Sequence, residues 1–159
     1  MTDNIIKNAR PARRSRAISH REIIRTYHED MDDLGVVYYA NYLKFMSRAR
    51  GEWLRAIGFD QAAFLRDRRL VFAVTRVEVD FLRPARLDDQ LAVSATLQGV
   101  GAASLDFQQE VKLVSGGLLC RGYVKLACVH ADTLRPRRIP PELLEKLTWR
   151  QVEKPGCVS

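Results

Sequence analysis

The chain has 159 residues and a formal net charge of +7, with 47% hydrophobic and 28% charged residues. This length and composition are typical of one globular domain and exclude a disordered or fibrous protein. No apolar run approaches the roughly 18 residues of a membrane-spanning helix, and the start MTDNIIKNAR lacks the apolar region of a secretory signal. We therefore expect a cytoplasmic protein without an integral membrane segment.

The positive charge is concentrated at the N-terminus. Residues 1–20 carry five basic groups and one acidic group, whereas the rest of the chain carries 21 basic and 18 acidic groups. More than half of the excess thus belongs to the first residues. We expect residues 1–16 to form a flexible basic arm, and we expect no nucleic-acid-binding face on the folded body.

The hydrophobic pattern predicts the elements that follow in chain order. It indicates a strand over about 18–27, a helix over 41–58, a shorter helix over 60–68, strands over 71–82, 91–97, 105–113 and 118–130, and a short helix over 141–147. Asn41 is a good N-cap for the long helix, Gly58 is a good stop for it, and Asp60 is a good cap for the next helix.

The strand over 71–82 alternates with a period of two. Its apolar face is predicted to hold Val71, Ala73, Thr75, Val77, Val79 and Phe81, opposite Arg76, Glu78 and Asp80. Short turns separate the later strands, so these strands are expected to be antiparallel neighbours.

The order of elements predicts the fold class. A sheet with one apolar face needs a cover, and the only long amphipathic segment is the helix over 41–57. The sequence therefore predicts an α+β domain over residues 17–150, in which an antiparallel sheet wraps around one long central helix, followed by a tail over 151–159.

The three cysteines, Cys120, Cys128 and Cys157, form no CxxC motif and have no metal-ligand spacing. Cys120 and Cys128 fall on the last predicted strand, where their separation is about 26 Å, too far for a disulfide. Unpaired cysteines fit the reducing cytoplasm. The sequence predicts neither a metal site nor a cofactor.

A run of carboxylates precedes the long helix. The segment 27–58 reads YHEDMDDLGVVYYANYLKFMSRARGEWLRAIG, and it contains the acidic run DMDDLG (30–35) shortly before the helix start. A carboxylate serves as a nucleophile or general base. Backbone amides at a helix N-terminus stabilise a developing oxyanion. Together these are groups that attack on a carbonyl carbon requires.

The segment resembles the signature of the hotdog-fold acyl-CoA thioesterases, most closely the YbgC branch of the 4-hydroxybenzoyl-CoA thioesterase family. The matching positions are Glu29, Asp30, Asp32, Gly35, Val36, Val37, Tyr38, Ala40, Asn41, Tyr42, Arg48, Ala49, Arg50 and Glu52. A second patch, VEVDFLRPARLDD (77–89), resembles a strand of the same branch. The resemblance implies a hotdog fold and hydrolysis of an acyl-CoA or acyl-carrier thioester to acid and thiol, without a cofactor.

The resemblance assigns the catalytic roles to three residues. Asp32 aligns with the catalytic aspartate, which acts as nucleophile or general base, and the sequence leaves that choice open. Tyr39 aligns with the residue whose backbone amide polarises the thioester carbonyl. His28 and Tyr39 stand where the branch usually has Tyr and His, so we hypothesise that the exchange conserves a His–Tyr pair.

The implied substrate-binding residues are Gly35, Val37, Tyr38, Asn41, Lys44, Arg83 and Arg86. Gly35 would let the chain pass close to the substrate. The three basic side chains are candidates for the phosphates of CoA or of phosphopantetheine, because Arg pairs with phosphate through two hydrogen bonds.

Two other interpretations apply to the acidic run. Asp30, Asp32 and Asp33 belong to a residue type that favours turns, so the run could serve structure alone. A calcium-binding loop is disfavoured, because Leu34 and Asn41 stand where such a loop needs an oxygen ligand and a Glu.

The resemblance also implies association. Family members pair two subunits edge to edge, with sites at the interface and often as a dimer of dimers, so we expect a homotetramer, or at least a dimer. The alternative function is a binding protein for acyl carrier protein or for the Tol–Pal envelope machinery, with little hydrolysis. Nucleic-acid binding through the basic arm is a weaker alternative.

Overall fold

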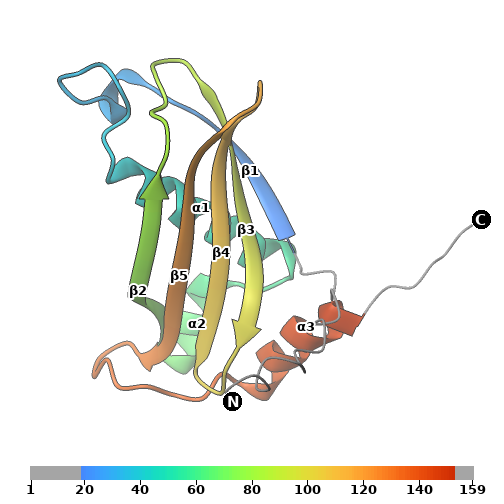
Figure 1. Ribbon diagram of the computed structural model, residues 1–159. Coiled ribbons are helices and arrows are strands. Elements are labelled where there is room, and N and C mark those ends of the chain that lie inside the picture. The colour runs from blue at the N-terminus through green and yellow to red at the C-terminus, as the bar shows by residue number, and fades with distance from the viewer. Residues whose placement is uncertain (1–18, 153–159) are drawn as a thin grey trace, which may run out of the picture.

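The structure, a computed structural model, describes residues 19–152 (Figure 1). Its elements are β1 (Ser19–Arg25), the 3₁₀ turn η1 (His28–Asp30), α1 (Asn41–Ala56), α2 (Gln61–Arg68), β2 (Leu70–Phe81), β3 (Gln90–Val100), β4 (Ser104–Leu113), β5 (Leu118–His130) and α3 (Pro141–Val152). The predicted basic arm at 1–16, and residues 153–159 of the predicted tail, lie outside the described residues. No described helix is long and apolar enough to cross a membrane.

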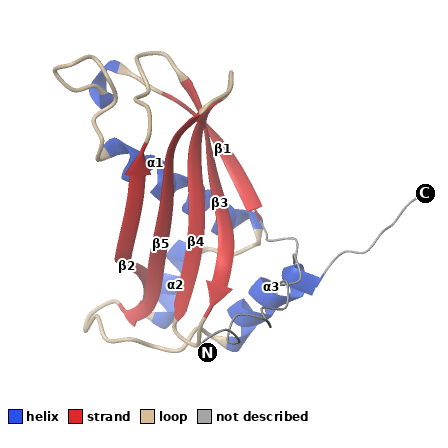
Figure 2. Cartoon of the chain, viewed as in Figure 1, coloured by secondary structure: helices blue, strands red, loops and turns tan. Residues whose placement is uncertain are grey.

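The five strands form one antiparallel sheet in the order β1-β3-β4-β5-β2. α1 lies along one face of this sheet, and α2 and α3 lie at the end away from the β2–β3 connection (Figure 1, Figure 2). The predicted α+β class, a sheet covered by one long helix, is confirmed. The expectation that consecutive strands are neighbours holds for β3–β4 and β4–β5 but is wrong for β2–β3, because β2 pairs with β5 and β3 pairs with β1. β1 and β2 are the edge strands.

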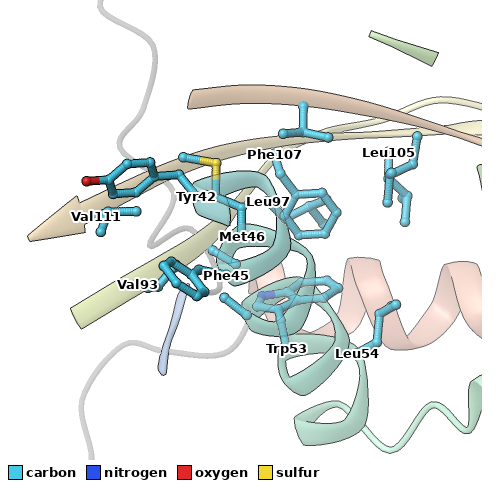
Figure 3. Close-up of a cluster of buried hydrophobic side chains, with 14 of the residues drawn as sticks. Tyr42, Phe45, Met46, Trp53, Leu54, Val93, Leu97, Leu105, Phe107 and Val111 are labelled. Carbon is cyan, nitrogen blue, oxygen red and sulfur yellow. The ribbon is translucent and has the colours of Figure 1, made fainter. Parts of the chain in front are cut away.

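The core lies between α1 and the inner face of the sheet. Buried residues recur along α1 at the predicted helical spacing and lie in one cluster with alternate residues of β3 and β4 (Figure 3). Residues of β5 belong to the same cluster. Trp53 of α1 and Phe107 of β4 are each at most 1% exposed, and their ring centroids lie 5.0 Å apart. Burying side chains of this size contributes roughly 3 kcal/mol each, so the core holds α1 firmly against the sheet.

The two ends of α1 differ in how well the sequence predicts them. Gly58 has φ +82° and its N–H donates to the Arg55 carbonyl at 3.0 Å, so it ends the helix as predicted. The predicted N-cap is wrong. Ala40 is the N-cap, without a side-chain hydrogen bond, and Asn41 is the first helical residue. The side chain of Asn41 is used elsewhere, as described below.

The shorter helices confirm one boundary and correct another. Asp60 caps α2 as predicted, because its carboxylate accepts the Ala63 N–H at 3.0 Å. α3 begins at Pro141 but continues to Val152, beyond the predicted end at residue 147.

β2 follows the predicted alternation only beyond a β-bulge at Thr75, where its register with β5 shifts. Before the bulge, Phe72 pairs with the core residue Cys128 and so lies on the inner face of the sheet, where its ring contacts those of Phe59 and Phe64. Val71 and Ala73 therefore lie on the other face, and their predicted placement is wrong because one extra residue reverses the alternation. The later members of the predicted apolar face keep their side: Val77, Val79 and Phe81.

Candidate functional site

The acidic run folds into a short hairpin that leads into α1. The Asp32 N–H donates to the Val36 carbonyl at 2.9 Å, and the Tyr38 N–H donates to the Asp30 carbonyl at 2.9 Å. An antiparallel bridge lies between these two bonds. The hairpin thus brings the carboxylates of the run next to the residues that precede the helix.

Asp32 shapes the tip of this hairpin. Its Oδ1 accepts the Leu34 N–H at 2.8 Å and the Val36 N–H at 3.3 Å. Gly35 has φ +75° and open space where a Cβ would lie, so the turn conformation is what requires glycine. Asp32 therefore does form the turn, as its residue type indicates. Its second oxygen, Oδ2, accepts no hydrogen bond from the described residues.

The chain turns from the hairpin into α1 at Tyr39. The Asn41 N–H closes this turn by donating to the Tyr38 carbonyl at 2.9 Å, and Ala40 is the N-cap. Within residues 19–152, the N–H groups of Tyr39 and Ala40 donate to no other group. Unpaired amides beside the positive end of a 16-residue helix suit a developing negative charge.

Asp30 connects the hairpin to the helix. Its buried carboxylate accepts the Tyr27 N–H at 2.8 Å and so caps η1. Its carbonyl accepts the Tyr38 N–H, and it also accepts the side-chain amide of Asn41 at 2.9 Å. Asp30 therefore has a structural role, and the Asn41 side chain holds the hairpin against the first turn of α1.

The second sequence patch, residues 77–89, forms hydrogen bonds with the hairpin and with α1. The Val37 N–H donates to the Ala85 carbonyl at 2.9 Å, and the Ala85 N–H donates to the Tyr42 hydroxyl at 2.9 Å. Thr26 donates its hydroxyl to the Arg86 carbonyl at 2.6 Å. The two patches that carry the family resemblance are therefore in contact. Val37, predicted as a substrate contact, is only 3% exposed and lies at the contact between the two patches.

Three aromatic side chains lie exposed beside the helix start. The ring centroids of Tyr38 and Tyr39 are 4.8 Å apart, and those of Tyr39 and Phe81 are 6.0 Å apart. A hydrogen bond with the Tyr39 side chain raises the pKa of Tyr38 above its ordinary value. Phe81 was not among the predicted site residues. Its place within the second patch, at the end of β2, is the signal that could have identified it.

His28 is the first residue of η1 and is exposed. Among the described residues, no hydrogen bond, ion pair or ring contact joins His28 to Tyr39. The Tyr39 ring contacts Tyr38 and Phe81 instead. The hypothesised His–Tyr pair is therefore not formed within one chain.

The predicted phosphate-binding residues lie around the hairpin. Lys44 is in the first turn of α1, and Arg83 and Arg86 are in the β2–β3 connection, at the same end of the molecule as the hairpin (Figure 1). All three side chains are exposed, and in the described part of the chain none of them makes a hydrogen bond or ion pair. Their charges are available to an anionic ligand.

Other features lie away from the hairpin. A cavity of about 280 Å³ lies between α2 and α3, beside Phe64 and Leu143, at the far end of α1. Cys120 and Cys128 share β5 as predicted, and burial raises the pKa of the Cys120 thiol to about 12, which makes it a poor nucleophile. The described residues include no group of three or more His, Cys, Asp or Glu that could hold a metal ion.

Comparison with known proteins identifies the class. The family model of the thioesterase-like superfamily matches residues 27–147, which include the hairpin, α1 and the whole β2–β5 region. The chain therefore belongs to the thioesterase-like superfamily.

Individual relatives agree with this class. The acyl-CoA thioesterase YbgC of Haemophilus influenzae is 38% identical over 120 residues, which cover 76% of this chain and 88% of the relative. The structure of a probable thioesterase from Bartonella henselae has a TM-score of 0.72 and 31% identity, over 77% of this chain and 99% of that one. The DHNA-CoA thioesterase of Staphylococcus aureus has a TM-score of 0.79 at 21% identity, over 84% and 91% of the two chains. The predicted hotdog fold is confirmed.

Proposed function

We propose that this protein is an acyl-CoA thioesterase, which hydrolyses an acyl-CoA or acyl-carrier thioester to the free acid and the thiol. One observation carries the proposal. The half-buried Asp32 carboxylate, with one oxygen held by backbone amides, lies in the hairpin that ends at the unpaired amide of Tyr39. Membership of the thioesterase-like superfamily and relatives named acyl-CoA thioesterases support the same reaction.

Asp32 supplies the reacting oxygen. The amides of Leu34 and Val36 hold Oδ1, so the orientation of Oδ2 is set before substrate binds. As general base, Oδ2 takes a proton from water, the water oxygen bonds to the thioester carbon, the C–S bond breaks, and the proton passes to the departing sulfur. As nucleophile, Oδ2 itself bonds to that carbon, the thiolate leaves, and water then hydrolyses the mixed anhydride.

Tyr39 acts through its backbone. Negative charge develops on the carbonyl oxygen when the tetrahedral intermediate forms in either route. The Tyr39 N–H, unpaired and beside the positive end of α1, donates to that oxygen. Any residue except proline could supply this donor, so the substitution of Tyr for the usual His leaves the role intact.

The surface around the hairpin offers two kinds of substrate contact. Tyr38, Tyr39 and Phe81 expose 45%, 61% and 50% of their surface and suit the acyl group. The cations of Lys44, Arg83 and Arg86 suit the phosphates of CoA or of phosphopantetheine. Gly35, in the exposed tip of the hairpin, is kept as a proposed substrate contact because it follows Asp32 in the same turn.

A second copy of the chain would complete this surface. β2 is a 12-residue edge strand, and among the described residues nothing pairs with its outer edge. It also exposes Val74 and Val77 on the face toward α1, by 50% and 40%. An open, apolar edge favours pairing with another strand. We therefore propose a homo-oligomer in which β2 pairs with its symmetry mate, as a dimer of dimers, in the cytoplasm.

A panel of acyl-CoAs of varied chain length and aromaticity tests the proposal. We expect thiol release from at least one of them, and we expect that release to depend on Asp32. If thiol release from every substrate stays at a background that does not depend on Asp32, the proposed hydrolysis is contradicted. That result would favour the alternative, a protein that binds acyl carrier protein or the Tol–Pal machinery.

A further inference from the structure

We propose that Asn41 is a positioning residue for the thioester site. Its side-chain amide holds the backbone two residues before Asp32 against the first turn of α1, and so sets the carboxylate relative to the Tyr39 amide. The inference rests on the proposed function, because it assumes that these two groups act on one thioester.

The bond made by Asn41 differs from the one expected of a cap. Asn41 is the first residue of α1, and its Nδ2 donates to the Asp30 carbonyl at 2.9 Å across eleven positions of sequence. A capping side chain would instead accept an N–H two or three residues further along the helix. The Asn41 side chain is therefore committed to the hairpin and adds nothing to the start of the helix.

The Asp30 carbonyl is the point where the hairpin meets the helix start. It accepts both the Tyr38 N–H and the Asn41 Nδ2 at 2.9 Å. The first bond occupies the Tyr38 amide and leaves the next amide, that of Tyr39, without a partner in the described chain. The two bonds together fix the Tyr38–Tyr39 peptide and the backbone leading to Asp32.

Helix propensity does not explain an asparagine at this position. Ala is a better helix former than Asn, and the turn before α1 is already closed by the backbone bond from the Asn41 N–H to the Tyr38 carbonyl. Replacing Asn41 with Ala should therefore leave α1 formed. The variant instead loses the hydrogen bond to the Asp30 carbonyl, so the hairpin is free to shift relative to the helix.

The first test is the steady-state kinetics of Asn41→Ala. A displacement of about 1 Å between reacting groups costs up to about 100-fold in rate, so we expect kcat to fall at least tenfold while KM stays within about twofold. Ser47→Ala, an exposed position on the same helix, is the matched control and should keep wild-type kinetics. A rise in KM at constant kcat would overturn the inference and assign Asn41 to substrate binding.

The second test uses the pH dependence of Asn41→Asp. An ionised carboxylate cannot donate to the Asp30 carbonyl and is repelled by it, whereas a protonated carboxyl donates in the same place as the amide. The ratio of kcat for Asn41→Asp to kcat for Asn41→Ala should rise as the pH falls toward about 4, the ordinary pKa of an aspartic acid side chain. A ratio that stays constant would contradict the inference.

The third test needs no activity. In Asn41→Ala, the amide hydrogens of Tyr38 and Asp32 should exchange faster with solvent than in the wild type, whereas Ser47→Ala should not change them. If no acyl-CoA is hydrolysed, the proposed function fails. Faster amide exchange in Asn41→Ala would still show that the Asn41 side chain holds the hairpin against α1. If hydrolysis depends on Asp32 but exchange is unchanged in Asn41→Ala, the proposed function stands and the inference about Asn41 is wrong.

Discussion

In the proposed mechanism, Asp32 combines a structural and a catalytic role, which its sequence context presents as alternatives. Its Oδ1 accepts two backbone amides and forms the turn, while Oδ2 remains available for chemistry. A turn-forming Asp and a catalytic Asp give the same sequence pattern, because both place a carboxylate before a glycine. Its neighbour Asp30 has only the structural role, since its carboxylate caps η1 and its carbonyl binds the helix start.

The exposed Tyr39 ring gives a prediction about which part of the residue matters. Tyr39→Phe keeps the backbone amide, so we expect kcat to stay within about threefold of wild type. It removes the hydroxyl whose hydrogen bond raises the pKa of Tyr38, so the Tyr38 phenol should ionise at a lower pH in the variant. Thiol release and ultraviolet pH titration measure the two effects. A large loss of kcat would show that the hydroxyl takes part in catalysis.

His28 gives a separate prediction. Because no contact joins His28 to Tyr39 among the described residues, the pH–rate profile of His28→Phe should have the same shape as that of the wild type. The measurement is kcat/KM across the pH range of activity. Loss of one ionisation in the variant would contradict this expectation and show that the His–Tyr pair forms in the working enzyme.

At the scale of elements, a buried polar contact joins α1 to the sheet. Arg50 Nη1 donates to Gln109 Oε1 at 2.8 Å, and Gln109 Nε2 donates to the Met46 and Ser94 carbonyls at 3.0 and 3.1 Å. Arg50 is only 8% exposed, and burial lowers its pKa to about 10, so it remains charged at neutral pH. Gln109 thus fixes α1 on β3 and β4 and satisfies a buried cation.

This contact predicts an order of stabilities. Gln109→Leu leaves the Arg50 guanidinium buried without its acceptor, so the free energy of unfolding should fall by about 3 kcal/mol. The double variant Arg50→Met/Gln109→Leu removes the charge as well and should be more stable than Gln109→Leu alone. Urea denaturation measures both. A double variant less stable than the single one would show that Arg50 has another stabilising partner.

The sequence predicts the elements well where one periodicity persists. The helical stripe of α1 and the alternation of β4 and β5 are confirmed, because buried residues recur at regular spacing there. The first half of β2 is wrong because the bulge at Thr75 reverses its faces. Local pattern also cannot show that Asn41 bonds to Asp30, or that Phe81 lies against Tyr39. These contacts depend on how the hairpin and β2 pack on α1.

At the scale of the whole molecule, the two edges of the sheet differ. β2 presents 12 residues with exposed apolar side chains, whereas β1 presents seven residues that include Arg21, Glu22 and Arg25. Charged, short edges resist pairing with another strand, and long apolar edges promote it. The difference favours β2 as the subunit contact, next to the hairpin that carries Asp32.

A lysine on each edge tests this difference. Val77→Lys on β2 should reduce the mass in solution toward the 18.2 kDa of one chain and should lower activity, because the site loses the neighbouring subunit. Ile23→Lys on β1, a position of similar exposure, should leave the assembly unchanged. Light scattering after size exclusion measures the mass, and circular dichroism checks folding. An unchanged mass in Val77→Lys would exclude the β2 contact.

The most direct measurement is thiol release by Asp32→Asn beside Asp33→Asn. Asparagine at position 32 still has an Oδ1 that accepts the Leu34 and Val36 amides, so the turn should persist while the nucleophile or base is lost. We predict that kcat falls by about 100-fold or more in Asp32→Asn, whereas the exposed neighbour Asp33→Asn keeps wild-type activity. Equal activity in the two variants would contradict the assignment of Asp32 as the reacting carboxylate.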